Sequence, residues 1–208
     1  MAETKKTKGA GRPKGSSREA GLARILPAAC KLFAEQGYSK TTFKDVGLAV
    51  GMTHAALYAY YPSKAALYLA TTDHAQALLQ PDYLAAIERG GTLKEQLRGI
   101  LMVSAAAHDR DSSITGLLAA IPLEIRRHPD VAKLMLSQQN SVLEILATAF
   151  AQAQANGEIS SEASPEDLVV AIMGAGVGIA LFQYGMQRSS LTDSMEIFID
   201  LIEARLFR

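Results

Sequence analysis

The sequence is poor in cysteine and in aromatic residues. Cys30 is the single cysteine, tryptophan is absent, and aromatic residues make up 6% of the 208 residues. A lone cysteine excludes an intramolecular disulfide, as is typical of proteins in the reducing cytoplasm. The longest apolar run, residues 168–182, has 15 residues, fewer than the roughly 20 that cross a membrane. The polar, basic start also lacks the apolar segment of a signal peptide, so we expect a cytoplasmic protein with no membrane partner.

Sequence signatures of common enzymes are missing too. There is no P-loop, no G-x-S-x-G nucleophile elbow, no dinucleotide-binding fingerprint and no cluster of His and Cys at metal-ligand spacing. The four histidines, His54, His74, His108 and His128, lie far apart in the sequence. His108 is followed by Asp109, but adjacent residues on a helix do not face each other. We therefore expect no catalytic activity, no metal and no cofactor.

The net charge of zero hides a strong asymmetry. Residues 1–68 contain 11 Lys or Arg and 4 Asp or Glu, whereas residues 69–208 contain 10 Lys or Arg and 17 Asp or Glu. A basic first part favours binding to a polyanion, although an imbalance of solubilising charges would look the same. Residues 1–17 carry five of the basic residues and almost nothing apolar, which predicts a disordered basic arm. Such an arm can enter a DNA minor groove or remain a solvated tail.

The residues that follow the arm predict a first helix and then two short ones. Apolar residues at helical spacing indicate a helix that starts at residue 17 and ends at Gly37, either bent or divided at Pro27. Thr42 is suited to cap a second helix, which ends at Gly51, and Thr53 to cap a third helix that extends to about residue 60. Two short helices joined by a tight glycine turn form a helix-turn-helix.

Residues 22–67 resemble the DNA-binding domain of the TetR family of transcriptional regulators. The matching segments, in order and spacing, are Ile25-Leu26-Pro27-Ala28-Ala29, Leu32-Phe33-Ala34-Glu35-Gln36-Gly37-Tyr38, Thr41-Thr42, Asp45-Val46, Gly51-Met52-Thr53, Leu57-Tyr58, Tyr60-Tyr61 and Ser63-Lys64. The resemblance implies a three-helix DNA-binding domain at residues 18–62. It also implies a larger helical domain at residues 63–208 that binds an effector and forms a homodimer.

The third helix is the expected recognition helix, whose first turn contacts base edges in the major groove. Small side chains such as Ala55 and Ala56 would let this helix lie deep in the groove. His54 can instead point to solvent and contact no base, and Tyr58 can instead serve only in packing. The expected DNA-binding residues are Thr42, Thr53, His54, Ala56, Tyr58, Tyr60 and Lys64.

The rest of the chain predicts further helices and no strand, so the fold class is all-α. Turn signals separate expected helices at residues 63–80, 92–109, 112–127, 129–156, 165–188 and 192–207. Small residues in the fifth of these helices and apolar residues in the sixth suggest a dimer interface, and the alternative is burial within one chain. The expected interface residues are Gly174, Gly178, Phe182, Met195, Phe198 and Ile202.

Polar residues among apolar ones in the middle helices suggest a ligand pocket. The expected pocket residues are Ser104, His108, Leu118, Pro122, Gln139, Leu143 and Phe150. A pocket of this composition suits a small apolar or aromatic effector with one or two polar groups. We therefore expect a repressor that a small-molecule effector releases from double-stranded operator DNA, with the helix at residues 63–80 as the lever. The alternative function is a helical protein-interaction or membrane-surface protein that uses the basic arm.

Overall fold

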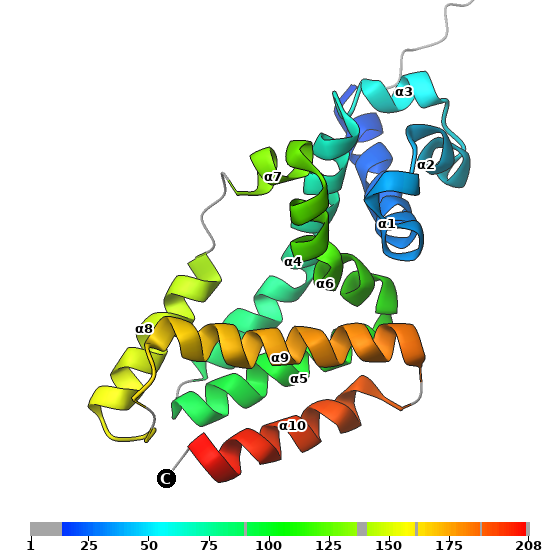
Figure 1. Ribbon diagram of the computed structural model, residues 1–208. Coiled ribbons are helices and arrows are strands. Elements are labelled where there is room, and N and C mark those ends of the chain that lie inside the picture. The colour runs from blue at the N-terminus through cyan, green and yellow to red at the C-terminus, as the bar shows by residue number, and fades with distance from the viewer. Residues whose placement is uncertain (1–13, 90, 137–140, 161, 188, 207–208) are drawn as a thin grey trace, which may run out of the picture.

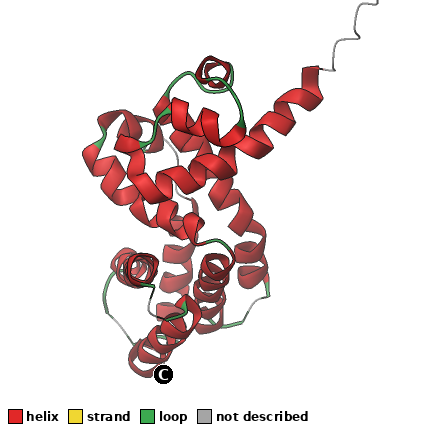
Figure 2. Cartoon of the chain, turned by 90° about the vertical axis from the view of Figure 1, so that its right-hand side faces the viewer, coloured by secondary structure: helices red, strands yellow, loops and turns green. Residues whose placement is uncertain are grey.

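The computed structural model describes residues 14–89, 91–136, 141–160, 162–187 and 189–206, and every regular element in this part of the chain is a helix (Figures 1 and 2). The all-α expectation is therefore confirmed. Residues 1–13 of the expected arm lie outside the described residues, and the first helix begins at Lys14, earlier than expected. The helices are α1 (Lys14–Lys40), α2 (Phe43–Val50), α3 (His54–Tyr58), α4 (Lys64–Glu88), α5 (Leu93–Arg110), α6 (Ser112–Arg127), α7 (Pro129–Met135), α8 (Ser141–Ala155), α9 (Pro165–Met186) and α10 (Leu191–Leu206).

The helices form two groups (Figure 1). The upper group consists of α1, α2, α3 and α7, and the lower group of α5, α8, α9 and α10, while α4 and α6 contact helices of both groups. One hydrophobic cluster joins Phe33 and Leu57 of the helix-turn-helix to Tyr68 of α4, Leu117 of α6 and Val131 of α7. The helix-turn-helix therefore shares its core with α4, α6 and α7, although the sequence suggested a domain boundary after residue 62.

Two of the expected helix boundaries within the chain are wrong. Pro81 does not end α4, which continues to Glu88. Pro27 lies inside α1, in agreement with the undivided alternative, and Gly37 is the residue that leaves helical dihedral angles. A proline removes one backbone hydrogen bond and costs about 3 kcal/mol in an isolated helix, and packing against neighbouring helices offsets that cost here. The single helix expected over residues 129–156 is divided into α7 and α8.

The caps expected for the helix-turn-helix are confirmed. The Thr42 side chain accepts the backbone N–H of Asp45, and the Asp45 carboxylate accepts the backbone N–H of Thr42 at 3.0 Å. Thr53 and Ser63 cap α3 and α4 in the same way, each accepting one backbone N–H. Gly51 ends α2 with φ of 66°, in the left-handed region. These local signals fix where α2 ends and at what angle α3 leaves it.

Gly51 gives a direct test of this turn. A left-handed backbone costs a side chain about 1–2 kcal/mol, so Gly51→Val should lower the free energy of unfolding by about that amount. Ala49→Val is the control. It introduces valine at an exposed position of α2 whose backbone is right-handed. Urea unfolding of both variants measures the difference, and equal losses would show that the turn does not depend on glycine.

Candidate nucleic-acid interface and ligand cavity

Helix α3 is short, and one of its residues anchors it to the core. Leu57 is fully buried, whereas Thr53 and His54 are exposed at its start and Tyr58 is 52% exposed at its end. The Tyr58 ring lies 4.6 Å from the Phe43 ring of α2 and 5.1 Å from the His54 ring, centroid to centroid. These contacts hold a half-exposed aromatic side chain in place, which reduces the entropy lost when it binds a partner.

The start of α2 lies beside α3, because the Phe43 and Tyr58 rings meet there. Thr42 is exposed at this point, and its hydroxyl donates to the Asp45 carboxylate at 2.6 Å. This hydroxyl and the Thr42 backbone N–H together lower the pKa of Asp45, so the carboxylate stays ionised at neutral pH. The structure therefore brings five of the expected DNA-binding residues into one region of α2 and α3: Thr42, Thr53, His54, Ala56 and Tyr58.

The structure places two other expected DNA contacts, Lys64 and Tyr60, against the end and the N-terminal half of α1. The Lys64 ammonium donates to the carbonyl oxygens of Tyr38 at 2.8 Å and Ser39 at 3.1 Å, and lies 4.3 Å from the Tyr38 ring centroid. It therefore joins the start of α4 to the end of α1 instead of pointing to solvent. The half-buried Tyr60 places its hydroxyl against Gly21 of α1, where a methyl group would clash. Both residues therefore hold α1 against the segment that follows α3.

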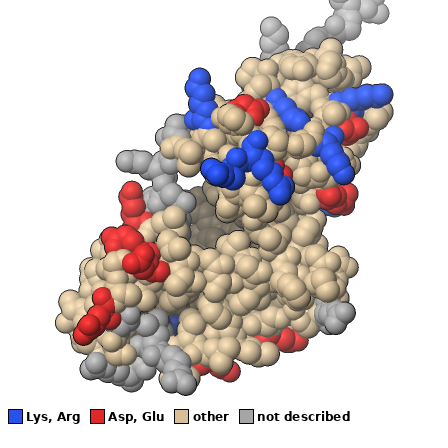
Figure 3. Space-filling model, in the orientation of Figure 1, with Lys and Arg blue, Asp and Glu red and all other residues tan. Residues whose placement is uncertain are grey.

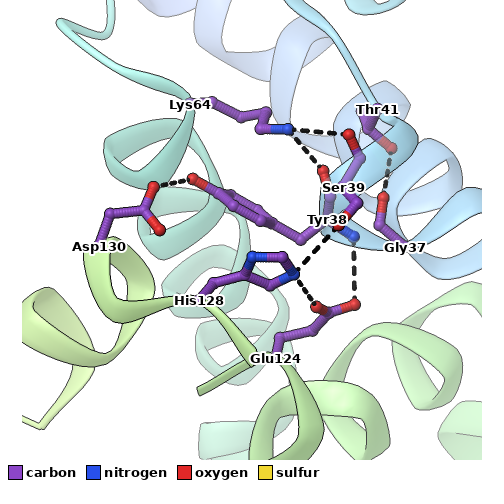
Figure 4. Close-up of polar contacts among 8 residues, drawn as sticks. All are labelled: Gly37, Tyr38, Ser39, Thr41, Lys64, Glu124, His128 and Asp130. Carbon is purple, nitrogen blue, oxygen red and sulfur yellow. Dashed lines mark hydrogen bonds and ion pairs between the residues drawn. The ribbon is translucent and has the colours of Figure 1, made fainter. Parts of the chain in front are cut away.

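Tyr38 is the centre of a polar joint that links the end of α1 to α6 and α7 (Figure 4). Its backbone N–H donates to Glu124 Oε1 of α6 at 3.1 Å, and its hydroxyl donates to the Asp130 carboxylate of α7. His128 Nε2 lies 3.1 Å from the second Glu124 oxygen and 3.2 Å from Ser39 Oγ. Burial and the neighbouring carboxylates raise the pKa of Tyr38, and the tyrosine hydroxyl lowers the pKa of Asp130. The joint therefore consists of Tyr38, Ser39, Glu124, His128 and Asp130.

The sequence interpretation missed this joint, although one signal was present. Glu124 lies seven residues after Leu117, so both fall on the same buried stripe of α6. A carboxylate on a buried stripe requires polar partners. That requirement identifies Glu124 as a structural residue, but the partner Tyr38 lies 86 residues away and local patterns do not identify it.

Loss of the Glu124 carboxylate should destabilise the joint. Glu124→Ala leaves the Tyr38 backbone N–H without its acceptor, and a buried hydrogen bond to a charged group is worth about 2 kcal/mol. We expect the free energy of unfolding to fall by that amount in a urea titration. Glu88→Ala, at the exposed end of α4, is the matched control and should change it little. Equal stability of the two variants would contradict the role given to Glu124.

A cavity of about 490 Å³ lies between α4, α5, α6, α9 and α10, and Figure 3 shows a recess in the surface between the upper group and α9. Exposed α4 residues form part of its wall, so the cavity is open to solvent on that side. The larger apolar side chains that line it are Leu79, Ile100, Leu101, Ile114, Leu118, Met173, Val177 and Met195, and the polar ones are Asp73, Gln76, Gln80, Tyr83, Ser104 and Thr115.

The cavity contains two of the expected pocket residues, Ser104 and Leu118. Four of the five other expectations are corrected. Phe150 is fully buried in a separate cluster with residues of α5 and α9, and Pro122 and Leu143 are exposed on outer helix faces. His108 is half-buried outside the cavity lining, and Gln139 lies outside the described residues. The cavity residues of α4 were not predicted, because the sequence analysis assigned this helix to transmitting the conformational change and not to lining the pocket.

Helices α9 and α10 present an apolar face to solvent. Phe182 is 63% exposed and Leu201 is 64% exposed, and Val170 and Ile197 are exposed to a similar degree. Gly174 and Gly178, on the same face of α9, have open space around them. By length and hydropathy α9 could cross a membrane, but one such helix is weak support because core and interface helices of soluble proteins have the same composition. A face of this kind is typical of a protein–protein interface.

The structure places the expected interface residues of α10 on the side of the helix that packs against α5 and α9. Met195 is 1% exposed and packs against α5 and α9 of its own chain, as the half-buried Phe198 and Ile202 also do. The outward stripe of the helix contains Ile197 and Leu201. Both stripes are apolar, so helical periodicity alone could not tell which one faces outward. On α9, Gly174, Gly178 and Phe182 do lie on the exposed face.

Comparison with known proteins gives the same fold and the same kind of first domain. Residues 25–71 match the profile of a family described as bacterial regulatory proteins, tetR family. The transcriptional regulator UidR of Escherichia coli K12 is 27% identical over 146 residues, which cover 67% of this chain and 69% of UidR. The family match covers α2, α3 and parts of α1 and α4, which are the elements that build the exposed surface around Tyr58.

Solved structures are similar over most of the chain. A regulator from Saccharomonospora viridis in complex with choline superimposes with a TM-score of 0.75 at 17% identity, over 91% of this chain and 99% of the other. The regulator FadR of Bacillus subtilis in complex with stearoyl-CoA gives a TM-score of 0.70 at 18% identity, over 86% and 96%. The helical domain therefore has the same fold as domains of proteins that bind very different small molecules.

Proposed function

Because this chain belongs to the TetR family and is a DNA-binding transcriptional regulator, we propose that it binds a palindromic operator as a homodimer and represses transcription until an effector releases it. The exposed first turn of α3, fixed by Leu57 and by the ring contacts of Tyr58, is the observation that carries this proposal. Thr53, His54 and Ala56 contact base edges in the major groove, and Thr42 and Tyr58 contact phosphates. The protein acts in the cytoplasm by binding and performs no catalysis.

The dimer forms through the outward faces of α9 and α10. Gly174 and Gly178 let the partner helix approach closely, because no side chain stands between the two backbones there. Phe182, Ile197 and Leu201 add apolar area that association removes from water. A twofold axis through this face gives two α3 helices per dimer, and a palindromic operator has the same symmetry.

Release follows from helices that belong to both the cavity and the joint. Residues of α6 between Ile114 and Ala119 line the cavity, and Glu124 of the same helix holds Tyr38. Residues of α4 line the cavity too, and Lys64 at its start holds the same turn. An effector that favours a different spacing of α4 and α6 therefore moves both helix-turn-helices and lowers the affinity for the operator. The lever consists of α6 as well as α4.

Selection of DNA by the purified protein tests this function. Random duplexes retained on the immobilised protein at moderate salt should converge on a palindromic sequence. A lipid-surface or protein-binding function predicts retention without sequence preference, because basic residues alone attract any duplex. Failure to enrich any sequence would contradict the proposal.

A further inference from the structure

The polar groups that line the cavity favour one kind of ligand end group. We propose, on the basis of the function proposed above, that the effector is an elongated apolar molecule with a hydrogen-bond donor, an alcohol or an ammonium group, at the end that contacts Tyr83 and Ser104. An effector with a negative charge, such as a carboxylate or a coenzyme A thioester, binds this cavity more weakly.

The hydrogen bonds of Tyr83 and Ser104 indicate that the ligand must be a hydrogen-bond donor. The Ser104 hydroxyl has one proton and donates it to the carbonyl oxygen of Ile100 at 3.1 Å. Tyr83 Oη lies 2.8 Å from Ser104 Oγ, and because the serine proton goes to Ile100 we assign the proton between the two hydroxyls to the tyrosine. Burial raises the pKa of Tyr83, and the phenol keeps that proton at neutral pH. Tyr83 Oη therefore offers the cavity lone pairs and no proton, and a ligand group there must donate.

Charge in the cavity points the same way. Asp73 is the one charged side chain among the described residues that line it, and Lys, Arg and His are absent from that lining. A ligand carboxylate would lose its hydration on entering the cavity and find no cation there to pair with. Burying an unpaired charge in an apolar cavity is strongly unfavourable. An ammonium group would meet no cation in this lining. The amides of Gln76 and Gln80 and the hydroxyl of Thr115 can donate or accept, so they do not select.

The shape of the cavity sets the length of the ligand. Asp73 and Tyr83 line the same wall and are ten residues apart on α4, which corresponds to about 15 Å along the helix. Apolar side chains such as Leu79, Ile100 and Leu118 lie among the lining residues. A decyl chain has a comparable length, so decyl compounds that differ only in the end group are suitable probes.

Calorimetry with 1-decanol, decylammonium, decyl methyl ether and decanoate tests the proposal without DNA. One net hydrogen bond corresponds to a factor of about 5 in affinity, so 1-decanol should bind about 5-fold more tightly than the ether, which accepts but does not donate. Decanoate should bind at least about 10-fold more weakly than 1-decanol, because burying its charge is unfavourable. Asp73 lies about 15 Å from Tyr83 along α4, so Asp73→Asn should change the affinities for decylammonium and 1-decanol by no more than about 2-fold. A larger loss for decylammonium would place its ammonium group at Asp73 and contradict the proposal.

Ser104→Ala gives the sharpest result. Without the serine, the Tyr83 proton is free to point into the cavity, so the ether gains a donor and the affinity ratio of 1-decanol to ether should fall to about 1. Tyr68→Phe is the control, since the Tyr68 hydroxyl is buried outside the cavity without a hydrogen-bond partner in the described part of the chain. The proposal would be overturned if decanoate bound as tightly as 1-decanol or if none of the four probes bound. An affinity ratio of 1-decanol to ether that stayed unchanged in Ser104→Ala would overturn it too. If 1-decanol binds as predicted but selected DNA is not released, the proposed function fails and the ligand preference stands.

Discussion

Phe182→Asp is expected to turn the dimer into a monomer and to weaken operator binding by at least about 100-fold. The side chain is 63% exposed within one chain, so a carboxylate there is tolerated by the monomer. In the dimer the same carboxylate would be buried against its symmetry mate, and two buried like charges oppose association strongly. A monomer holds one recognition helix, and it loses the gain in affinity that comes from binding two half-sites at once.

Light scattering and a gel-shift titration measure the two effects together. Leu136→Asp is the matched control, because Leu136 is 71% exposed at the end of α7 and lies away from α9 and α10. We expect this control to remain dimeric and to bind DNA normally. A Phe182→Asp protein that stays dimeric would show that the interface lies elsewhere.

Ala55→Glu is expected to abolish operator binding while the fold and the dimer persist. Ala55 is exposed in the first turn of α3, the part of a recognition helix that enters the major groove. A longer, negatively charged side chain there meets the bases sterically and repels the phosphates, and we expect a loss of about 100-fold or more. Stability should change little, because an acidic residue near a helix N-terminus is favourable.

The matched control introduces the same charge far from α3. Ala151→Glu is exposed on α8 and should reduce DNA binding by no more than a small factor, through the change in net charge alone. Thermal unfolding confirms that both variants are folded. If the Ala55→Glu protein bound the operator with the same affinity as the Ala151→Glu protein, α3 would not be part of the DNA interface.

The sequence predicted the helix-turn-helix well because its signals are local. Thr42, Thr53 and Ser63 cap the helices that they precede, and Gly51 supplies the left-handed residue that ends α2. Each of these effects depends on a backbone group within three residues of the side chain. For the same reason the exposed start of α3 could be identified before its neighbours in space were known.

The helical domain was predicted less well because its features depend on packing between distant segments. Pro81 predicts the end of a helix, but α4 packs against α5 and stays helical beyond this residue. The two apolar stripes of α10 are equivalent in the sequence, and only the position of α5 and α9 makes the Met195 stripe the inner one. The cavity likewise results from five helices that meet, so a polar residue such as His108 cannot be assigned to it from α5 alone.

A hydroxyl-radical footprint of the protein on the selected duplex tests the central claim most directly. Two α3 helices related by a twofold axis predict symmetric protection of two half-sites, about one helical turn of DNA or a multiple of it apart. The Ala55→Glu protein should leave both half-sites unprotected. Protection without twofold symmetry, or protection that persists in Ala55→Glu, would contradict the claim that paired α3 helices bind the operator.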